Sequence, residues 1–159
     1  MSTQALSPLP SVSSGPAPGH WLGLDGWVCV VTGAASGIGA AMAQAFAEAG
    51  ARVALLDRDA LGAARQAEAL RAQGASALAL DCDIADEHAV TQAAQRVREE
   101  LGPVRALVNN AGLLRPGTLD NVTLAEWNAV LAVNLTGYLL CARAFGQDML
   151  AQGRGSIVH

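Results

Sequence analysis

The chain has 159 residues, of which 52% are hydrophobic and 15% are charged, and its formal net charge is −4. This length suits one domain with a sizeable core, and the low charged fraction favours elements covered on both sides, as in a parallel sheet between helices. The ten basic residues are scattered arginines, and no uninterrupted apolar run approaches the ~18 residues of a membrane span, so we expect neither a nucleic acid nor a membrane as partner.

The N-terminal segment predicts a tail. Residues 1–22 are rich in Ser, Pro and Gly, and the first basic residue of the chain is Arg52. A secretory signal needs a positively charged start with an apolar stretch, and a transit peptide needs arginines. We therefore expect a disordered tail over residues 1–22, one domain over residues 23–159, and a cytoplasmic protein.

Hydrophobic patterning predicts strands and helices in strict alternation. Short apolar, often β-branched runs predict strands, and apolar residues at helical spacing predict helices. The expected strands are residues 27–32, 52–56, 77–80, 104–108 and 155–159. The expected helices are residues 37–49, 59–73, 86–101 and 123–152, the last opened by the capping box Thr123-Leu124-Ala125-Glu126. The pattern predicts an α/β fold, a Rossmann-type doubly wound parallel sheet, incomplete because its fifth strand is cut short.

The first expected strand runs into a glycine-rich segment, Thr32–Gly39 (TGAASGIG), and then into a helix. Glycines let the backbone approach a phosphate closely, and a helix N-terminus offers free N–H groups with a partial positive charge. A purely structural turn would also use glycines. The position between a strand and a helix favours a site for the phosphates of a dinucleotide.

Asp57 ends the second expected strand, about 20 residues beyond the glycine loop, where dinucleotide-binding domains carry an acidic residue. A carboxylate there accepts hydrogen bonds from the adenosine ribose and repels a 2′-phosphate. Capping of the next helix is a compatible second role for Asp57. Arg58 leaves some room for a phosphate, but the pattern favours NAD over NADP as cofactor.

The cysteines Cys29, Cys82 and Cys141 form no C-x-x-C pair, and each lies in or beside an apolar segment. A catalytic or metal-binding thiol is the alternative, but small buried residues in a reducing compartment fit this pattern better. The three histidines are equally dispersed, so we expect no metal site.

Four motifs in order resemble the short-chain dehydrogenase/reductase family over about residues 24–159. They are the glycine loop (T-G-x-x-x-G-I-G in the family), Asn109–Gly112 (NNAG) after the fourth strand, Val133–Gly137 (VNLTG) in the long helix, and Gly155–Val158 (GSIV). The resemblance implies hydride transfer between a nicotinamide ring and a carbonyl or alcohol substrate. It also implies a homo-oligomer for the full-length protein, with the long helix in the subunit interface.

The resemblance further implies a set of site residues. Asn134 would be catalytic and would organise a proton-carrying water, although an asparagine that merely kinks the helix is the alternative. Asn110 would touch the cofactor, although a turn-forming asparagine is also possible. The implied cofactor contacts are Gly33, Ser36, Gly37, Ile38, Gly39, Asp57, Asp83, Ile84, Asn110, Ala111 and Gly112.

The family's proton-transferring serine, tyrosine and lysine have no counterpart in this sequence. Tyr138 is the only tyrosine, Ala142 stands four residues after it, and no lysine is present. We therefore expect the N-terminal part of a longer NAD-dependent enzyme, catalytically incompetent alone, with an unprotected fifth strand and an uncovered face on the long helix. The alternative is a non-catalytic dinucleotide-binding or partner-binding module, or a non-functional remnant.

Overall fold

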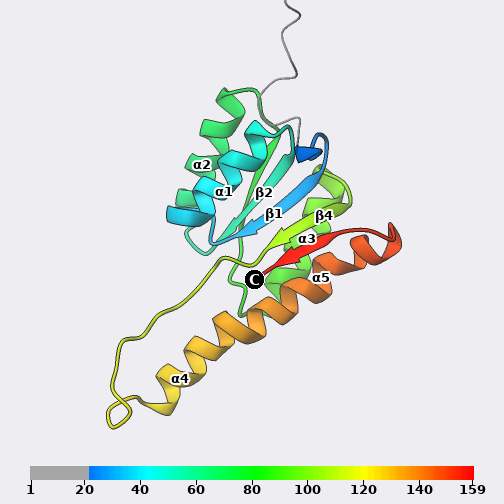
Figure 1. Cartoon of the computed structure of the whole chain (residues 1–159). Coiled ribbons are helices and arrows are strands. Elements are labelled where there is room, and N and C mark those ends of the chain that lie inside the picture. The colour runs from blue at the N-terminus through cyan, green and yellow to red at the C-terminus, as the bar shows by residue number, and fades with distance from the viewer. Residues whose placement is uncertain (1–21) are drawn as a thin grey trace, which may run out of the picture.

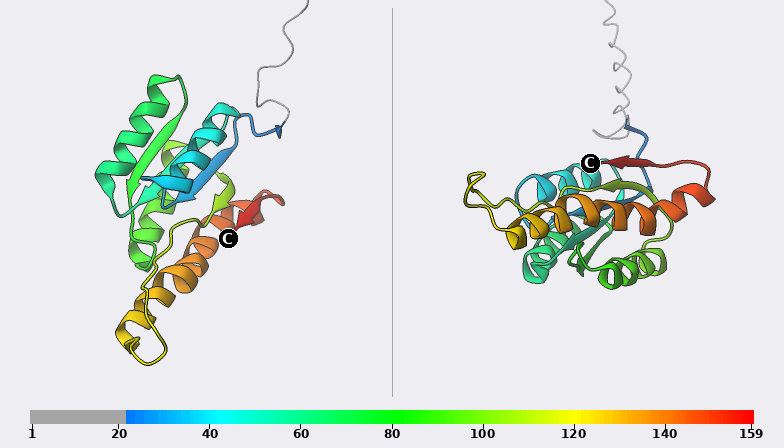
Figure 2. Two further views of the ribbon diagram at one scale, coloured as in Figure 1. Left: turned by 60° about the vertical axis from the view of Figure 1, so that its left-hand side comes forward. Right: turned by 90° about the horizontal axis from the view of Figure 1, so that it is seen from below.

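The computed structural model describes residues 22–159, so the tail expected over residues 1–22 lies essentially outside the described residues. One parallel sheet is covered by helices on both faces (Figures 1 and 2). Its elements are β1 (Val28–Thr32), α1 (Gly37–Glu48), β2 (Arg52–Asp57), α2 (Ala60–Ala72), β3 (Ala77–Asp81), α3 (Glu87–Glu100), β4 (Val104–Val108), α4 (Leu124–Leu131), the π-helical segment η2 (Ala132–Gly137), α5 (Tyr138–Ala151) and β5 (Ser156–Val158).

The strand order is β3-β2-β1-β4-β5, and every pairing is parallel. The chain builds outward from β1 to β3 and then returns to add β4 on the other side of β1. This reversal makes the carboxyl ends of β1 and β4 the topological switch point, where open α/β sheets bind their ligands. The predicted doubly wound parallel fold is confirmed.

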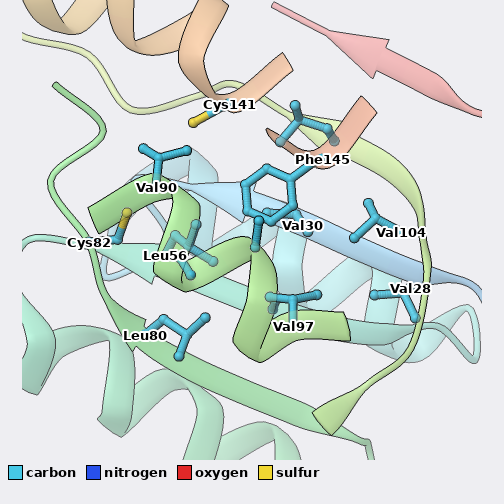
Figure 3. Close-up of a cluster of buried hydrophobic side chains, with 14 of the residues drawn as sticks. Val28, Val30, Leu56, Leu80, Cys82, Val90, Val97, Val104, Cys141 and Phe145 are labelled. Atoms are coloured by element: carbon cyan, nitrogen blue, oxygen red, sulfur yellow. The ribbon is translucent and has the colours of Figure 1, made fainter. Parts of the chain in front are cut away.

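Alternate residues of each strand feed two separate cores. On one face Val30 and Leu56 join side chains of α3 and α5, and on the other face Val31 and Leu55 join α1 and α2. Figure 3 shows the first core, with Phe145 reaching from α5 toward the sheet. Because both faces are covered, the strands need continuous apolar runs rather than an alternating pattern, which is what the sequence has.

The long helix predicted for residues 123–152 is continuous but not uniform, because η2 replaces six residues of α-helix with wider π turns. Its inner side buries Cys141, Phe145 and Met149 against α3 and the sheet. Its other side carries exposed apolar residues, which we call the outer stripe: Leu124, Trp127, Leu135, Leu139 and Leu150. Figure 1 shows α4 projecting beyond the sheet together with the loop that precedes it.

The same helix qualifies the expectation that no segment of the chain suits a membrane span. Over Leu124–Ala151 it has 28 residues and a mean hydropathy of 1.4 in its most apolar window, so it is long and apolar enough to cross a membrane. It nevertheless carries the charged residues Glu126, Arg143 and Asp148, and Asp148 pairs with Arg98 of α3. Core helices of soluble proteins meet the same limits, so length and composition alone do not make this helix a membrane span.

Among residues 22–159, the last strand, β5, pairs with β4 alone and is exposed throughout its three residues. Within the described residues its outer edge has no neighbouring strand.

Candidate functional site

A pocket of about 390 Å³ opens at the carboxyl ends of the strands, at the switch point. Its lining includes most of the residues expected to contact a cofactor: Gly33, Ser36, Ile38, Asp57, Asp83, Ile84, Asn110, Ala111 and Gly112. Arg58, Cys82, Leu113 and Val133 complete the wall. Gly37, Gly39 and Asn134, which were also expected at the site, do not line the pocket.

The glycine loop has the shape that its glycines allow. Gly33 and Gly37 adopt positive φ angles of 67° and 57°, which side chains other than glycine rarely accept. A Cβ on Gly39 would overlap the carbonyl oxygen of Gly33 and would lie 2.6 Å from the Asn110 amide nitrogen. Gly39 therefore packs against Gly33 and Asn110, Gly37 supplies a positive-φ turn, and Gly33 forms part of the pocket surface.

The start of α1 faces the same pocket through Ser36 and Ile38. Ser36 is the N-cap residue in an extended conformation, and its side chain makes no capping hydrogen bond. The first amide groups of a helix lack partners within the helix and carry a partial positive charge. This end of the pocket is therefore suited to an anionic group such as a phosphate.

Asp57 is held in a fixed orientation between two loops. Its Oδ2 accepts the N–H of Ala35 in the glycine loop at 2.9 Å, and its Oδ1 accepts the N–H of Asp59 at 2.9 Å. Each carboxylate oxygen has a further lone pair available for a ligand hydroxyl. The expected capping role falls instead to Asp59, the N-cap of α2, whose side chain accepts the N–H of Gly62.

Thr32 is a buried side chain at the centre of the site that sequence reasoning missed. Its Oγ1 accepts the N–H groups of Asn110 and Ala111, both at 3.0 Å. The Asn110 amide in turn donates to the carbonyl oxygens of Thr32 and Gly33. The available signal was a hydroxyl residue at the end of an otherwise apolar strand. These bonds join the ends of β1 and β4, so the Asn110 amide positions the two loops against each other.

Asn134 lies in η2, beside the pocket wall. Its Oδ1 accepts the N–H of Leu113 at 2.8 Å, and its Nδ2 donates to the carbonyl oxygen of Leu113 at 2.9 Å. The side-chain amide thus ties the helix to the chain that follows β4. The catalytic role expected for Asn134 stays a prediction.

The predicted burial of the three cysteines is confirmed, and all three are free thiols. Cys82 borders the pocket, and its pKa is raised to about 12 by burial and then by the carboxylates of Asp83, Asp81 and Asp86. It is therefore a neutral thiol at physiological pH and not a nucleophile. Within residues 22–159, no group of three or more His, Cys, Asp or Glu residues is placed to hold a metal ion.

Comparison with known proteins identifies a family whose sequences match most of this chain. The short chain dehydrogenase family model matches residues 27–159. A D-threitol dehydrogenase of Mycolicibacterium smegmatis is 44% identical over 136 residues, which are 86% of this chain and 52% of that enzyme. The chain thus spans about half the length of this relative.

Two solved structures share the arrangement. A metagenomic short-chain oxidoreductase in complex with NADP is 41% identical with a TM-score of 0.79, and the match covers 84% of this chain and 61% of that one. A short chain dehydrogenase/reductase from Burkholderia phymatum in complex with NAD is 36% identical with a TM-score of 0.81. That match covers 84% of this chain and 48% of the Burkholderia chain. These two neighbours carry different dinucleotides on the same fold.

Proposed function

Because the chain belongs to the short-chain dehydrogenase family, we propose that its pocket binds NAD for an oxidoreductase that transfers hydride between the nicotinamide ring and a small alcohol or carbonyl substrate. The observation that carries this proposal is the fixed carboxylate of Asp57 beside a glycine loop and a helix N-terminus. A phosphate-binding turn next to a hydroxyl-binding carboxylate matches the two polar parts of an adenosine diphosphate group.

The residues present fit such a cofactor. Gly33 presents its backbone to the pocket with no side chain in the way, so a pyrophosphate can approach the loop closely. In the proposed arrangement Gly33, Ser36 and Ile38 lie along the phosphates, and Asp57 holds the adenosine ribose. Bound there, the nicotinamide group supplies the hydride donor or acceptor. The exposed carboxylate of Asp83 and the buried Ile84 would flank the adenine.

The preference for NAD over NADP rests on charge and rigidity. Two backbone N–H groups hold the Asp57 carboxylate at the pocket. A 2′-phosphate on the ribose would have to sit beside that negative charge. Arg58 also lines the pocket and offers a cation, but it is exposed, so its attraction is screened by water and salt.

We further propose that proton transfer is left to groups outside these 159 residues. The sequence holds no lysine, and the hydroxyl of its single tyrosine is engaged with the Ala111 carbonyl. Asn134, held next to the pocket, is proposed as a catalytic residue only in the complete enzyme. The competing function is a dinucleotide-binding module without turnover. Oxidation of D-threitol, the alcohol named for the relative above, by the complete gene product with NAD would exclude it.

The setting proposed for this activity is a homo-oligomer in the cytoplasm, with a second copy of the chain covering the outer stripe. Five large apolar side chains stay exposed there at helical spacing. A stripe along one helix is self-complementary when two copies pack antiparallel, as a two-fold interface requires. The three buried free thiols suit a reducing compartment.

The test is cofactor affinity in the wild-type protein and in Asp57→Asn, measured by isothermal titration calorimetry. We expect the wild type to bind NAD about tenfold or more tightly than NADP, and Asp57→Asn to lose most of this preference, because one charge has been removed at constant shape. Glu68→Gln, which removes an exposed carboxylate of α2 outside the pocket lining, is the matched control and keeps the preference. Tighter binding of NADP, or no binding of either dinucleotide by the wild type, would contradict the proposal.

A further inference from the structure

Tyr138 is a half-buried side chain that the proposed hydride chemistry does not use. It lies at the start of α5, and its hydroxyl donates to the carbonyl oxygen of Ala111 at 3.0 Å. Its ring stacks on His159 with a centroid distance of 5.5 Å and an interplanar angle of 16°. Ring stacking alone would be served by phenylalanine, so the hydroxyl needs a separate explanation.

The partner of this hydroxyl, Ala111, is the residue on which the glycine loop rests. A Cβ on Gly33 would lie 2.7 Å from the Ala111 Cα, so the two backbones are already in direct contact. The Ala111 N–H is bonded to Thr32 at the end of β1. Ala111 is therefore held by β1 through its N–H and by α5 through its carbonyl, and Gly33 and Ala111 both line the pocket.

The chain after β4 is bonded to the helix a second time, by Asn134, and the spacing of the two bonds is similar on the helix and on the chain. Asn134 and Tyr138 are four residues apart, which is about 6 Å along a helix. Their partners are Leu113 for Asn134 and Ala111 for Tyr138. These two residues are about 6.6 Å apart if the chain between them is extended. The segment after β4 is thus fastened to the helix at two points, with the two chains running in opposite directions. Asn134 fixes one end of Ala111–Leu113, and Tyr138 fixes the other.

We propose that Tyr138 is a positioning residue for the cofactor pocket, whose hydroxyl holds Ala111 against the glycine loop and so sets the separation of the two pocket walls. Without this bond, Ala111 keeps its N–H bond to Thr32 but loses its attachment to the helix, and the wall gains freedom that a bound dinucleotide must remove. The cofactor consequence rests on the proposed dinucleotide function. The mechanical role of Tyr138 does not, and it can be tested in the ligand-free protein.

The experiment compares Tyr138→Phe with the wild type in the complete gene product. The substitution keeps the ring and its stacking and removes only the hydroxyl. We expect amide hydrogen exchange over residues 110–113 to quicken about threefold or more, and the dissociation constant for NAD to rise about three- to tenfold. The melting temperature should fall no further than in Thr91→Val. That control deletes a comparable hydroxyl bond, from Thr91 to the Glu87 carbonyl oxygen on α3, outside the pocket lining.

The outcomes separate the two proposals. If the wild type binds neither NAD nor NADP while exchange over residues 110–113 quickens in Tyr138→Phe, the dinucleotide function fails and the positioning role stands. If exchange over residues 110–113 is unchanged in Tyr138→Phe, the positioning role is overturned whatever the affinity. An unchanged NAD affinity together with quicker exchange would overturn the claim that Ala111 sets the pocket walls.

Discussion

Several polar side chains at the pocket hold the backbone, and Asp57 both holds it and keeps capacity for a ligand. Thr32, Asn110 and Asn134 direct their hydrogen bonds to backbone groups of neighbouring loops. Asp57 also accepts two backbone N–H groups, but a carboxylate has lone pairs left over. These motif residues therefore hold the backbone around the pocket, and under the proposed function Asp57 is the residue that selects the cofactor.

The cysteines give a prediction at the same scale. Burial raises the pKa values of Cys29, Cys82 and Cys141 to about 12, against about 8.5 for an unfolded thiol. The folded state thus favours the neutral thiols, a stabilisation that is complete below about pH 8.5 and is lost as the pH rises toward 12. We expect the free energy of unfolding to fall between about pH 9 and pH 11.

Urea denaturation at several pH values from about 7 to 11 measures this fall, and thiol titration with a chromogenic disulfide at pH 8 checks the burial that causes it. The native protein should react slowly, and the protein unfolded in guanidinium, which serves as the control, should release three equivalents at once. Rapid reaction of Cys82 in the native protein would show that the pocket exposes a reactive thiolate.

Asp148 of helix α5 binds both α3 and β4. Asp148 Oδ1 accepts from Arg98 of α3 at 2.7 Å, and its Oδ2 accepts the N–H of Val104 at the start of β4 at 3.1 Å. The Asp148 side chain is 11% exposed, whereas the pair Arg96–Glu100 on α3 has side chains 56% and 44% exposed. The two ion pairs should therefore differ in what they contribute to stability.

We expect Asp148→Ala to lower the free energy of unfolding by about 2–3 kcal/mol, because the Val104 N–H loses its partner and Arg98 its counter-ion. The matched change Glu100→Ala should cost about 0.5 kcal/mol or less, as exposed i,i+4 pairs do. Urea denaturation of the two variants measures both values. Equal losses of unfolding free energy in the two variants would mean that Asp148 contributes no more to stability than an exposed ion pair does.

At the scale of the whole domain, both faces of the sheet are covered, and within residues 22–159 the outer stripe of the long helix stays exposed and the outer edge of β5 has no neighbouring strand. The exposed stripe residues Leu124, Leu135 and Leu150 are 73%, 63% and 79% accessible, which is high for large apolar side chains on one helix. Apolar surface gathered in this way marks an interaction site.

A charge placed in the stripe tests the proposed second copy. Leu139→Glu should convert an oligomer into monomers, because an unpaired carboxylate would be buried at the interface. The control Leu61→Glu changes a similarly exposed leucine on α2 and should leave the oligomer intact. Sedimentation velocity gives the mass of each variant. A wild type that is monomeric at tens of micromolar, or that sediments with lipid vesicles, would contradict the proposal.

The alternation of strands and helices, the parallel class of the sheet, and most of the pocket lining could be predicted from the sequence. Each of these features depends on residues that are close together in the sequence. Apolar runs and helical periodicity identify elements, and glycines or an acidic residue directly after a strand mark its carboxyl end. Helix and strand limits differ from those expected by a residue or so, since end residues depend on caps.

Only the tertiary structure decided which residues meet. The bond between Thr32 and Asn110 joins positions 78 apart in sequence. The hydrogen bond from Tyr138 to the Ala111 carbonyl oxygen depends on how the helix lies beside the sheet. The wider turns of η2 and the choice of Asp59 over Asp57 as helix cap were likewise settled by packing and loop geometry. Local patterns report burial and propensity, but a hydrogen bond between distant segments needs the strand order that brings them together.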